Sequence, residues 1–164
     1  MSETFTARVW VLGDDIDTDI IIPTEYLALK TIDDMKQYGF SPLRPELAAQ
    51  IQPGDVIVAG KNFGCGSSRE QAPEIIKALG IRAVIAKSFA RIFFRNSINN
   101  GLLLIENGDL HDAVKEGDEI EVTMGERIVA NGKEFPIASL PQNLLDIINA
   151  GGLVKAMRKR NGLD

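Results

Sequence analysis

The stretch from Val56 to Ile105 decides the fold: VIVAGKNFGCGSSREQAPEIIKALGIRAVIAKSFARIFFRNSINNGLLLI. It contains three short apolar runs with the length and composition of buried strands, at 56–59, 83–86 and 102–105. Between them, segments 68–79 and 88–98 place apolar residues at helical spacing. Strands that alternate with helices in this way are typical of parallel βαβ units. We therefore predict an α/β fold with a parallel centre.

The segments on either side complete the expected domain. Residues 8–12 are a β-rich run, and short helices are expected near 33–38 and 46–51. After residue 107 the pattern changes to short alternating segments separated by turn residues, which predict antiparallel strands at 119–123, 127–129 and 134–137. Two closing helices are expected at 140–148 and 153–160. We predict one domain, residues 1–164, with a small antiparallel C-terminal β portion.

Composition excludes several classes of function. The chain has 164 residues, 45% of them hydrophobic, and a formal net charge of −5, which argues against a nucleic-acid-binding surface. Its single cysteine, Cys65, excludes a disulfide framework within the chain, a multi-cysteine zinc site and an iron–sulfur cluster held by this chain alone. No apolar run approaches the roughly 18–20 residues that span a bilayer, and residues 1–4 do not resemble the start of a signal peptide. We expect a cytoplasmic protein with no membrane partner.

The glycine-rich loop Gly64-Cys65-Gly66-Ser67-Ser68-Arg69 follows a predicted strand and precedes a predicted helix. Such a loop can turn backbone N–H groups toward an anion. A purely structural interpretation is also available, because Ser67 with Glu70 three residues later has the pattern of a helix capping box. Arg69 favours an anion site, since a cation near a helix N-terminus is unfavourable unless something negative neutralises it. A carboxylate would fit its guanidinium group.

Two other segments carry candidate residues. Asp19 lies in the acidic stretch 14–19, where an aspartate is most often a solvated turn residue or a helix cap. Arg91 and Arg95 share one face of the helix predicted at 88–98, and we interpret this helix as structural, with Phe89, Ile92 and Phe93 packing.

Three segments, in this order and spacing, resemble the small subunit of 3-isopropylmalate dehydratase, of the aconitase superfamily: DDIDTD with the following IP and YL (14–27), VAGKNFGCGSSRE (58–70) and AKSFARIFFRN (86–96). The likeness covers nearly the whole chain. It implies an aconitase-type swivelling domain and a hydro-lyase that is active only with a large subunit. That partner would carry a [4Fe–4S] cluster, while this chain binds neither cofactor nor metal.

The resemblance also implies roles for individual residues. Ser67 matches the serine that acts as the base, and Arg69 matches the arginine that binds a substrate carboxylate. Ser68 would add a hydrogen bond beside Gly66, and Asp19 matches an active-site aspartate with an orienting or electrostatic role. The reaction implied is dehydration and rehydration that interconverts 2-isopropylmalate and 3-isopropylmalate in branched-chain amino acid (leucine) biosynthesis.

The chain departs from the family pattern after Tyr26-Leu27. Many relatives continue with Arg-Thr, whereas this chain has Ala28, Leu29 and Lys30 in the loop that faces the variable group of the substrate in the family. Homoaconitate, or citramalate or dimethylmalate, therefore stays open as an alternative substrate. A non-catalytic module that binds an anion at the glycine-rich loop is the alternative from a different class.

Overall fold

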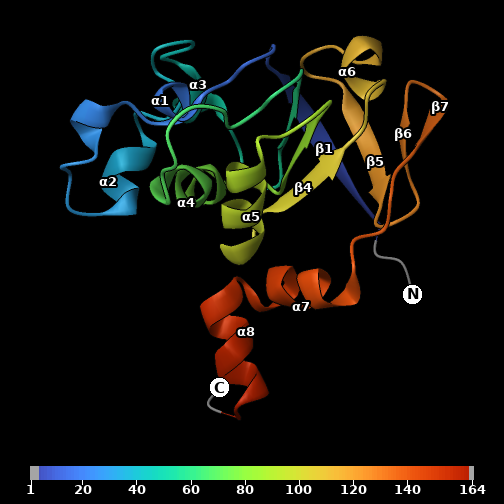
Figure 1. The fold of residues 1–164 in the computed structure, drawn as a ribbon. Helices are drawn as coiled ribbons and strands as arrows, with labels where there is room; N and C mark the ends of the chain where they lie inside the picture. Colours follow the sequence, from blue (N-terminus) through green and yellow to red (C-terminus); the bar gives the residue numbers. More distant parts are fainter. Residues whose placement is uncertain (1–3, 163–164) are drawn as a thin grey trace.

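The computed structural model describes residues 4–162. Its strands form one sheet of seven, in the order β4-β3-β2-β1-β5-β6-β7 (Figure 1). The strands are β1 Thr4–Val11, β2 Val56–Ala59, β3 Ala83–Ala86, β4 Leu103–Glu106, β5 Glu119–Thr123, β6 Arg127–Ala130 and β7 Lys133–Pro136. Strands β1 to β4 pair in parallel, and β5 to β7 continue the sheet in antiparallel pairs. The predicted parallel centre and antiparallel C-terminal portion are confirmed.

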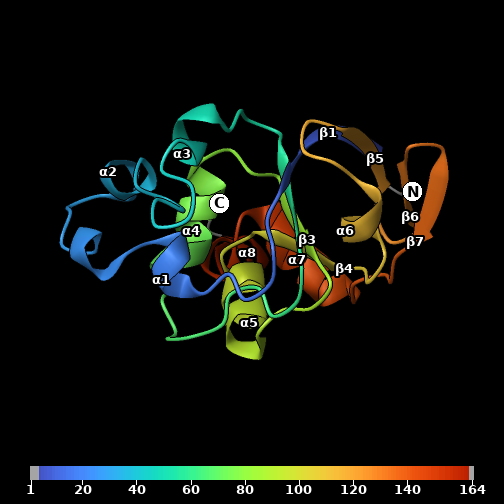
Figure 2. The same cartoon turned by 90° about the horizontal axis from the view of Figure 1, so that it is seen from above.

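Strand β1 joins the two parts of the sheet. Its Val9 lies opposite Val56 of β2 in a parallel pair, and its Phe5 lies opposite Val122 of β5 in an antiparallel pair. The chain between β1 and β2 holds four short helices: α1 Thr18–Ile21, η1 Thr24–Tyr26, α2 Ile32–Lys36 and α3 Leu47–Gln50. Seen from above, α1, α2 and α3 lie at one end of the molecule and β5 to β7 at the other (Figure 2).

The central strands are buried on both faces. Successive side chains of a strand point to opposite sides, so Ile57 and Val84 enter one apolar cluster while Val58 and Ile85 enter another. Helices α4 (Gln71–Ala78) and α5 (Arg91–Asn99) contribute to the first cluster, and α6 (Leu110–Ala113) contributes Leu110 to the second. Strands covered on both faces appear in sequence as continuous apolar runs, which is why β2 and β3 were predicted at their observed bounds.

Helices α4 and α5 begin about three residues later than predicted. Before α5, the backbone N–H of Phe63 donates to Ser88 O and that of Ala90 donates to Phe63 O, so residues 88–90 extend the parallel pairing instead of starting a helix. Before α4, residues 68–70 are a turn-and-loop connection, and Glu70 occupies the N-cap position with no side-chain cap hydrogen bond. The later start of α4 matters for function, because Ser67 is then too far from the helix to cap it.

The C-terminal helices α7 (Gln142–Ala150) and α8 (Leu153–Arg160) extend below the body of the molecule in Figure 1. Both were predicted, α8 with the same bounds and α7 shifted by two residues. Close backbone contact anchors them, because a Cβ on Gly101 would lie 2.6 Å from the carbonyl carbon of Gly151. Within residues 4–162, no helix combines the length and apolar character needed to cross a bilayer.

Candidate functional site

The glycine-rich loop between β2 and α4 lies against the acidic segment that follows β1. Three hydrogen bonds join them: Gly64 N to Ile16 O (2.7 Å), Thr18 N to Cys65 O (3.0 Å) and Thr18 Oγ1 to Ser67 O (2.7 Å). Thr18 is buried and starts α1, which Asp17 caps by accepting from Ile20 N at 2.8 Å. Two segments that are about 47 residues apart in the chain are therefore held as one unit.

Gly64 is required by the shape of this loop. Its φ of +84° lies in the left-handed region, and a Cβ built there would lie 2.1 Å from Cγ of Phe93. Phe93 is itself buried on α5 and packs edge-on against Phe63. Gly66 also has a positive φ, of +88°, although a Cβ there would meet nothing closer than 3.4 Å. Close approach therefore constrains Gly64, and backbone conformation alone constrains Gly66.

Arg69 is held mainly by the segment around α1. Its guanidinium group forms an ion pair with Asp19, donates from Nη1 to Ile22 O at 2.8 Å and donates from Nη2 to Thr24 Oγ1 at 2.8 Å. The Arg69 side chain is only 13% exposed, whereas that of Asp19 is 63% exposed. A negative partner was predicted for Arg69 because of its position near a helix N-terminus, and Asp19 is such a partner. The structure therefore brings these two predicted residues together.

A cavity of about 220 Å³ opens where this loop meets the start of α5. Its lining combines polar and apolar side chains: Thr18, Gly64, Gly66, Ser68, Arg69, Ala90, Arg91, Ile92, Phe93 and Asn96. Ser68 Oγ accepts a hydrogen bond of 3.3 Å from Asn96 Nδ2, which links the glycine-rich loop to α5 across the cavity. Of the predicted residues, Gly66, Ser68 and Arg69 therefore share one small cavity.

Ser67 lies between two cavity-lining residues, Gly66 and Ser68, without itself lining the cavity. It is exposed, and its carbonyl oxygen is fixed by Thr18. Its hydroxyl makes no hydrogen bond within residues 4–162. The capping-box interpretation is wrong in this structure, because α4 begins at Gln71 and no side chain caps it. The Ser67 hydroxyl is therefore free to contact a ligand.

Cys65 is in the same loop but has a different character. Burial raises the pKa of its thiol, and the neighbouring carboxylates of Asp17 and Asp15 raise it further. The thiol therefore stays protonated at neutral pH, which is unfavourable for a nucleophile or a metal ligand. Elsewhere in residues 4–162, no three His, Cys, Asp or Glu side chains are grouped as a metal site would require. The residues of this chain do not fit a four-thiolate cluster site.

The predicted specificity residues lie outside the cavity lining. Ala28 and Lys30 are exposed, and Leu29 is partly buried against the main apolar cluster. They follow η1, whose Tyr26 stacks on Tyr38 with ring centroids 3.9 Å apart. The structure does not bring these three residues together with Ser68 and Arg69.

Sequence reasoning missed the contribution of α5 to the site. Phe93 packs in the core as expected, but Ile92 is 61% exposed and lines the cavity, so its predicted packing role is wrong. Because α5 begins at Arg91, its buried face carries Phe93, Ser97 and Ile98, and Ile92 points elsewhere. The extended conformation of residues 88–90 determines where α5 begins and therefore which of its faces is buried. The helical spacing of apolar residues in the sequence does not predict this conformation.

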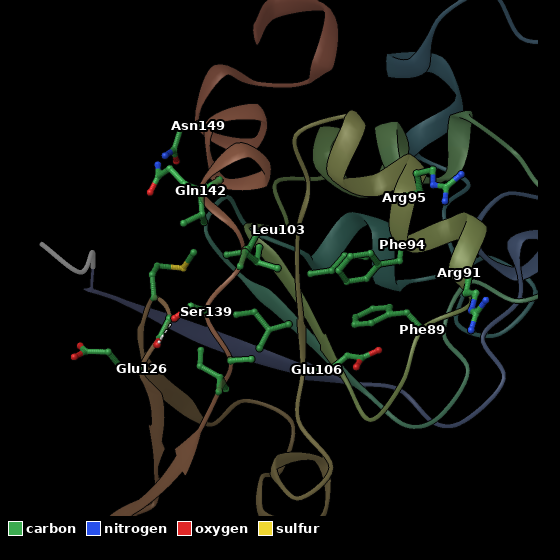
Figure 3. Close-up of a pocket in the computed structure, with 18 residues that line it drawn as sticks. Phe89, Arg91, Phe94, Arg95, Leu103, Glu106, Glu126, Ser139, Gln142 and Asn149 are labelled. Atoms are coloured by element: carbon green, nitrogen blue, oxygen red, sulfur yellow. Dashed lines mark hydrogen bonds between the residues drawn. The ribbon is translucent and has the colours of Figure 1, made fainter.

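A larger groove, of about 990 Å³, lies on the other side of α5 between β4, the β5–β6 turn and α7. Figure 3 shows Phe89 and Phe94 pointing into this groove, toward Leu103, and Arg91 and Arg95 on the α5 side of its lining. None of the site residues predicted from the sequence lines this groove, and Arg91 lines both the groove and the smaller cavity. The smaller cavity is therefore the candidate active site.

Comparisons with known proteins show the family of the chain. The model of the aconitase C-terminal domain matches residues 20–109, which include Arg69 and the first turn of α5. The 3-isopropylmalate dehydratase small subunit of Lachnospira eligens is 79% identical over 164 residues, covering 100% of both chains. The isopropylmalate/citramalate isomerase small subunit of Methanocaldococcus jannaschii is 43% identical, covering 98% of this chain and 97% of that one.

A solved structure extends the likeness to three dimensions. That of 3-isopropylmalate dehydratase from Methanocaldococcus jannaschii superposes with a TM-score of 0.91 and 42% sequence identity, covering 97% of this chain and 96% of the other. Sequence and fold therefore agree over nearly the full length. The chain belongs to the 3-isopropylmalate dehydratase small subunits of the aconitase superfamily.

Proposed function

We propose that this chain supplies the base and a carboxylate-binding wall of a [4Fe–4S] hydro-lyase that interconverts 2-isopropylmalate and 3-isopropylmalate. The observation that carries the proposal is the cavity where Ser68 and Arg69 meet beside the free hydroxyl of Ser67. Its cationic and hydroxyl lining suits a small hydroxy acid that carries carboxylates.

In this proposal Ser67 takes the proton from the carbon next to a carboxylate. Removal of that proton leaves extra negative charge on the substrate, and the hydroxyl group then departs from the neighbouring carbon. Serine is a very weak acid, so its oxygen must be strongly stabilised when it acts as a base. In this proposal the positive charge of Arg69, two residues further along the chain, and the N–H groups of the glycine-rich loop stabilise it. Rehydration adds the proton held by Ser67 to the carbon that lost the hydroxyl and adds a hydroxyl to the carbon that lost the proton, which gives the isomer.

Arg69 and Ser68 would hold the substrate while this happens. Arg69 binds a carboxylate through the N–H groups that its contacts with Ile22 and Thr24 leave free, and Ser68 adds a hydrogen bond. Asp19 acts as a positioning residue, because its ion pair fixes the guanidinium group before substrate arrives. A guanidinium group that is already oriented loses little conformational entropy on binding.

The cluster-bearing partner is the second part of the proposal, since this chain alone does not fit a cluster site. When bound to the large subunit, the cluster supplies a Lewis acid for the departing hydroxyl. The isolated chain is expected to be folded, colourless and inactive. Anaerobic mixing with the large subunit should produce dehydratase activity, measured by formation of the unsaturated acid. Turnover by this chain alone in metal-free buffer would overturn the two-chain proposal.

Substrate choice is a separate part of the proposal and depends on Ala28, Leu29 and Lys30. The apolar side chains of Ala28 and Leu29 favour a branched apolar substituent over a third carboxylate, whose burial without a fixed partner costs several kcal/mol. Discrimination between alkyl groups should be modest, about 1–3 kcal/mol per methylene. The printed name of the Methanocaldococcus jannaschii relative supports citramalate as a second substrate.

The specificity prediction is tested by comparing kcat/KM for isopropylmalate, citramalate and homoaconitate in the assembled enzyme. Isopropylmalate and citramalate should be preferred, and Lys30→Ala should change their kcat/KM by less than about tenfold, because a flexible exposed lysine contributes little to a neutral group. A strong preference for homoaconitate that disappears in Lys30→Ala would contradict the choice of substrate and leave the proposed chemistry intact.

A further inference from the structure

We propose that Arg91, the first residue of α5, binds the second carboxylate of the substrate, on the wall of the cavity that α5 provides. The inference rests on the proposed function, which requires a substrate with two carboxylates. It assigns a role to a residue that the sequence pattern indicated only as part of a structural helix face.

Arg69 does not suffice for a dicarboxylate. Both of its terminal nitrogens already contact Asp19, Ile22 or Thr24 within the chain. Asp19 also offsets much of its positive charge. The donors that remain can serve one carboxylate, so a second anionic group needs another cation, either from the large subunit or from this chain.

Arg91 has the properties that this second group requires. It lines the same cavity from α5, on the side opposite the glycine-rich loop to which Ser68 and Arg69 belong. It is exposed, and its side chain forms no ion pair or hydrogen bond within residues 4–162. Arg91 also lines the large groove, so it lies where the two hollows adjoin at the start of α5. Its guanidinium group therefore has a full set of donors available.

The surroundings of Arg91 favour a bound anion. The first turn of α5 has no acidic residue and no side-chain cap, although an arginine there opposes the helix dipole. Among the residues that the structure describes, the lining of the small cavity contains no Asp or Glu, and neither Glu106 nor Glu126, which line the large groove with Arg91, forms an ion pair with it. At about 220 Å³ the cavity is smaller than the roughly 300–1,000 Å³ clefts of drug-sized ligands and suits a small organic acid.

Arg95 offers a matched control for this proposal. It lies one helical turn after Arg91, is also exposed, and lines the large groove as Arg91 does, but it does not line the small cavity. The experiment uses the full chain assembled with its large subunit. Binding of succinate, a dicarboxylate, and of butyrate, its monocarboxylate counterpart, is measured by calorimetry for the wild type, Arg91→Gln, Arg91→Lys and Arg95→Gln. KM and kcat for 2-isopropylmalate are measured on the same samples.

Arg91→Gln should weaken succinate binding and raise KM at least about tenfold, the scale of one lost charge-assisted contact. Butyrate binding should change by less than about twofold, Arg91→Lys should recover part of the loss, and Arg95→Gln should match the wild type. An unchanged succinate-to-butyrate ratio in Arg91→Gln, or an equal effect of Arg95→Gln, overturns the proposal. Binding is measured without turnover, so the two proposals can fail separately. If the assembled enzyme is inactive but Arg91→Gln still lowers its affinity for succinate relative to butyrate, the proposed function is refuted and the role of Arg91 is supported.

Discussion

Replacement of Ser67 by alanine should lower kcat of the assembled enzyme by about 10²–10⁴, the usual contribution of a positioned acid or base. The free energy of unfolding should change by less than about 0.5 kcal/mol, as is usual for an exposed side chain without special contacts. This small value follows from the structure, because Ser67 does not cap α4 and its hydroxyl bonds to no residue within 4–162. Steady-state kinetics and urea denaturation of the same protein check both values.

Ser139→Ala is the control for this experiment. Ser139 is also exposed, and its hydroxyl donates to Gly125 O at 3.2 Å, but it lines only the large groove. Its kcat should equal that of the wild type. A Ser67→Ala enzyme with nearly normal kcat and a loss of about 1 kcal/mol, the value of a helix cap, would mean that Ser67 is structural.

The second large effect is expected on stability, in Gly64→Ala. The substitution places a Cβ 2.1 Å from Phe93 and imposes a φ of +84° on alanine. The left-handed conformation costs about 1–2 kcal/mol, and overpacking against a buried ring adds about 1–3 kcal/mol. We expect a total loss of about 2–5 kcal/mol in urea denaturation, from these two costs together. Activity should also fall, because Phe93 lines the cavity.

Gly54→Ala separates the two causes. Gly54 has a φ of +94°, and a Cβ there would meet nothing within 4 Å. It should therefore lose only the conformational part, about 1–2 kcal/mol, and retain full activity. If Gly64→Ala and Gly54→Ala lose the same free energy, the contact with Phe93 does not constrain the loop.

The sequence predicted the strands of the sheet better than it predicted the starts of helices. Apolar runs such as Val56–Ala59 are long enough to identify, and burial on both faces leaves few alternatives. The start of α5 depends on the pairing of Phe63 with Phe89, a long-range contact that local periodicity does not contain. Helix α1 was missed because its four residues are stabilised by Asp17 and by contacts with the glycine-rich loop.

The same reason limited the prediction of the site. The position of Arg69 indicated that it needed a negative partner, and the structure identifies Asp19 as one. No local pattern in the sequence indicates that pair, because Asp19 and Arg69 are 50 residues apart and spacing rules apply only to near neighbours in the chain. Only the family resemblance connected them. The sequence predicted Arg91 and Ile92 only as parts of a structural helix. Which face of α5 is buried depends on the residue at which the helix begins, and that residue was not predicted.

The central claim is that this chain contributes an essential base to an active site completed by a second chain. It is tested most directly by competition: wild-type and Ser67→Ala chains are mixed in varying proportion, at constant total concentration, with a limiting amount of large subunit. If Ser67→Ala binds the partner normally but lacks the base, activity should fall in proportion to the fraction of variant and approach zero. Activity that does not depend on that fraction, while the variant is shown by sedimentation to occupy the large subunit, would contradict the claim.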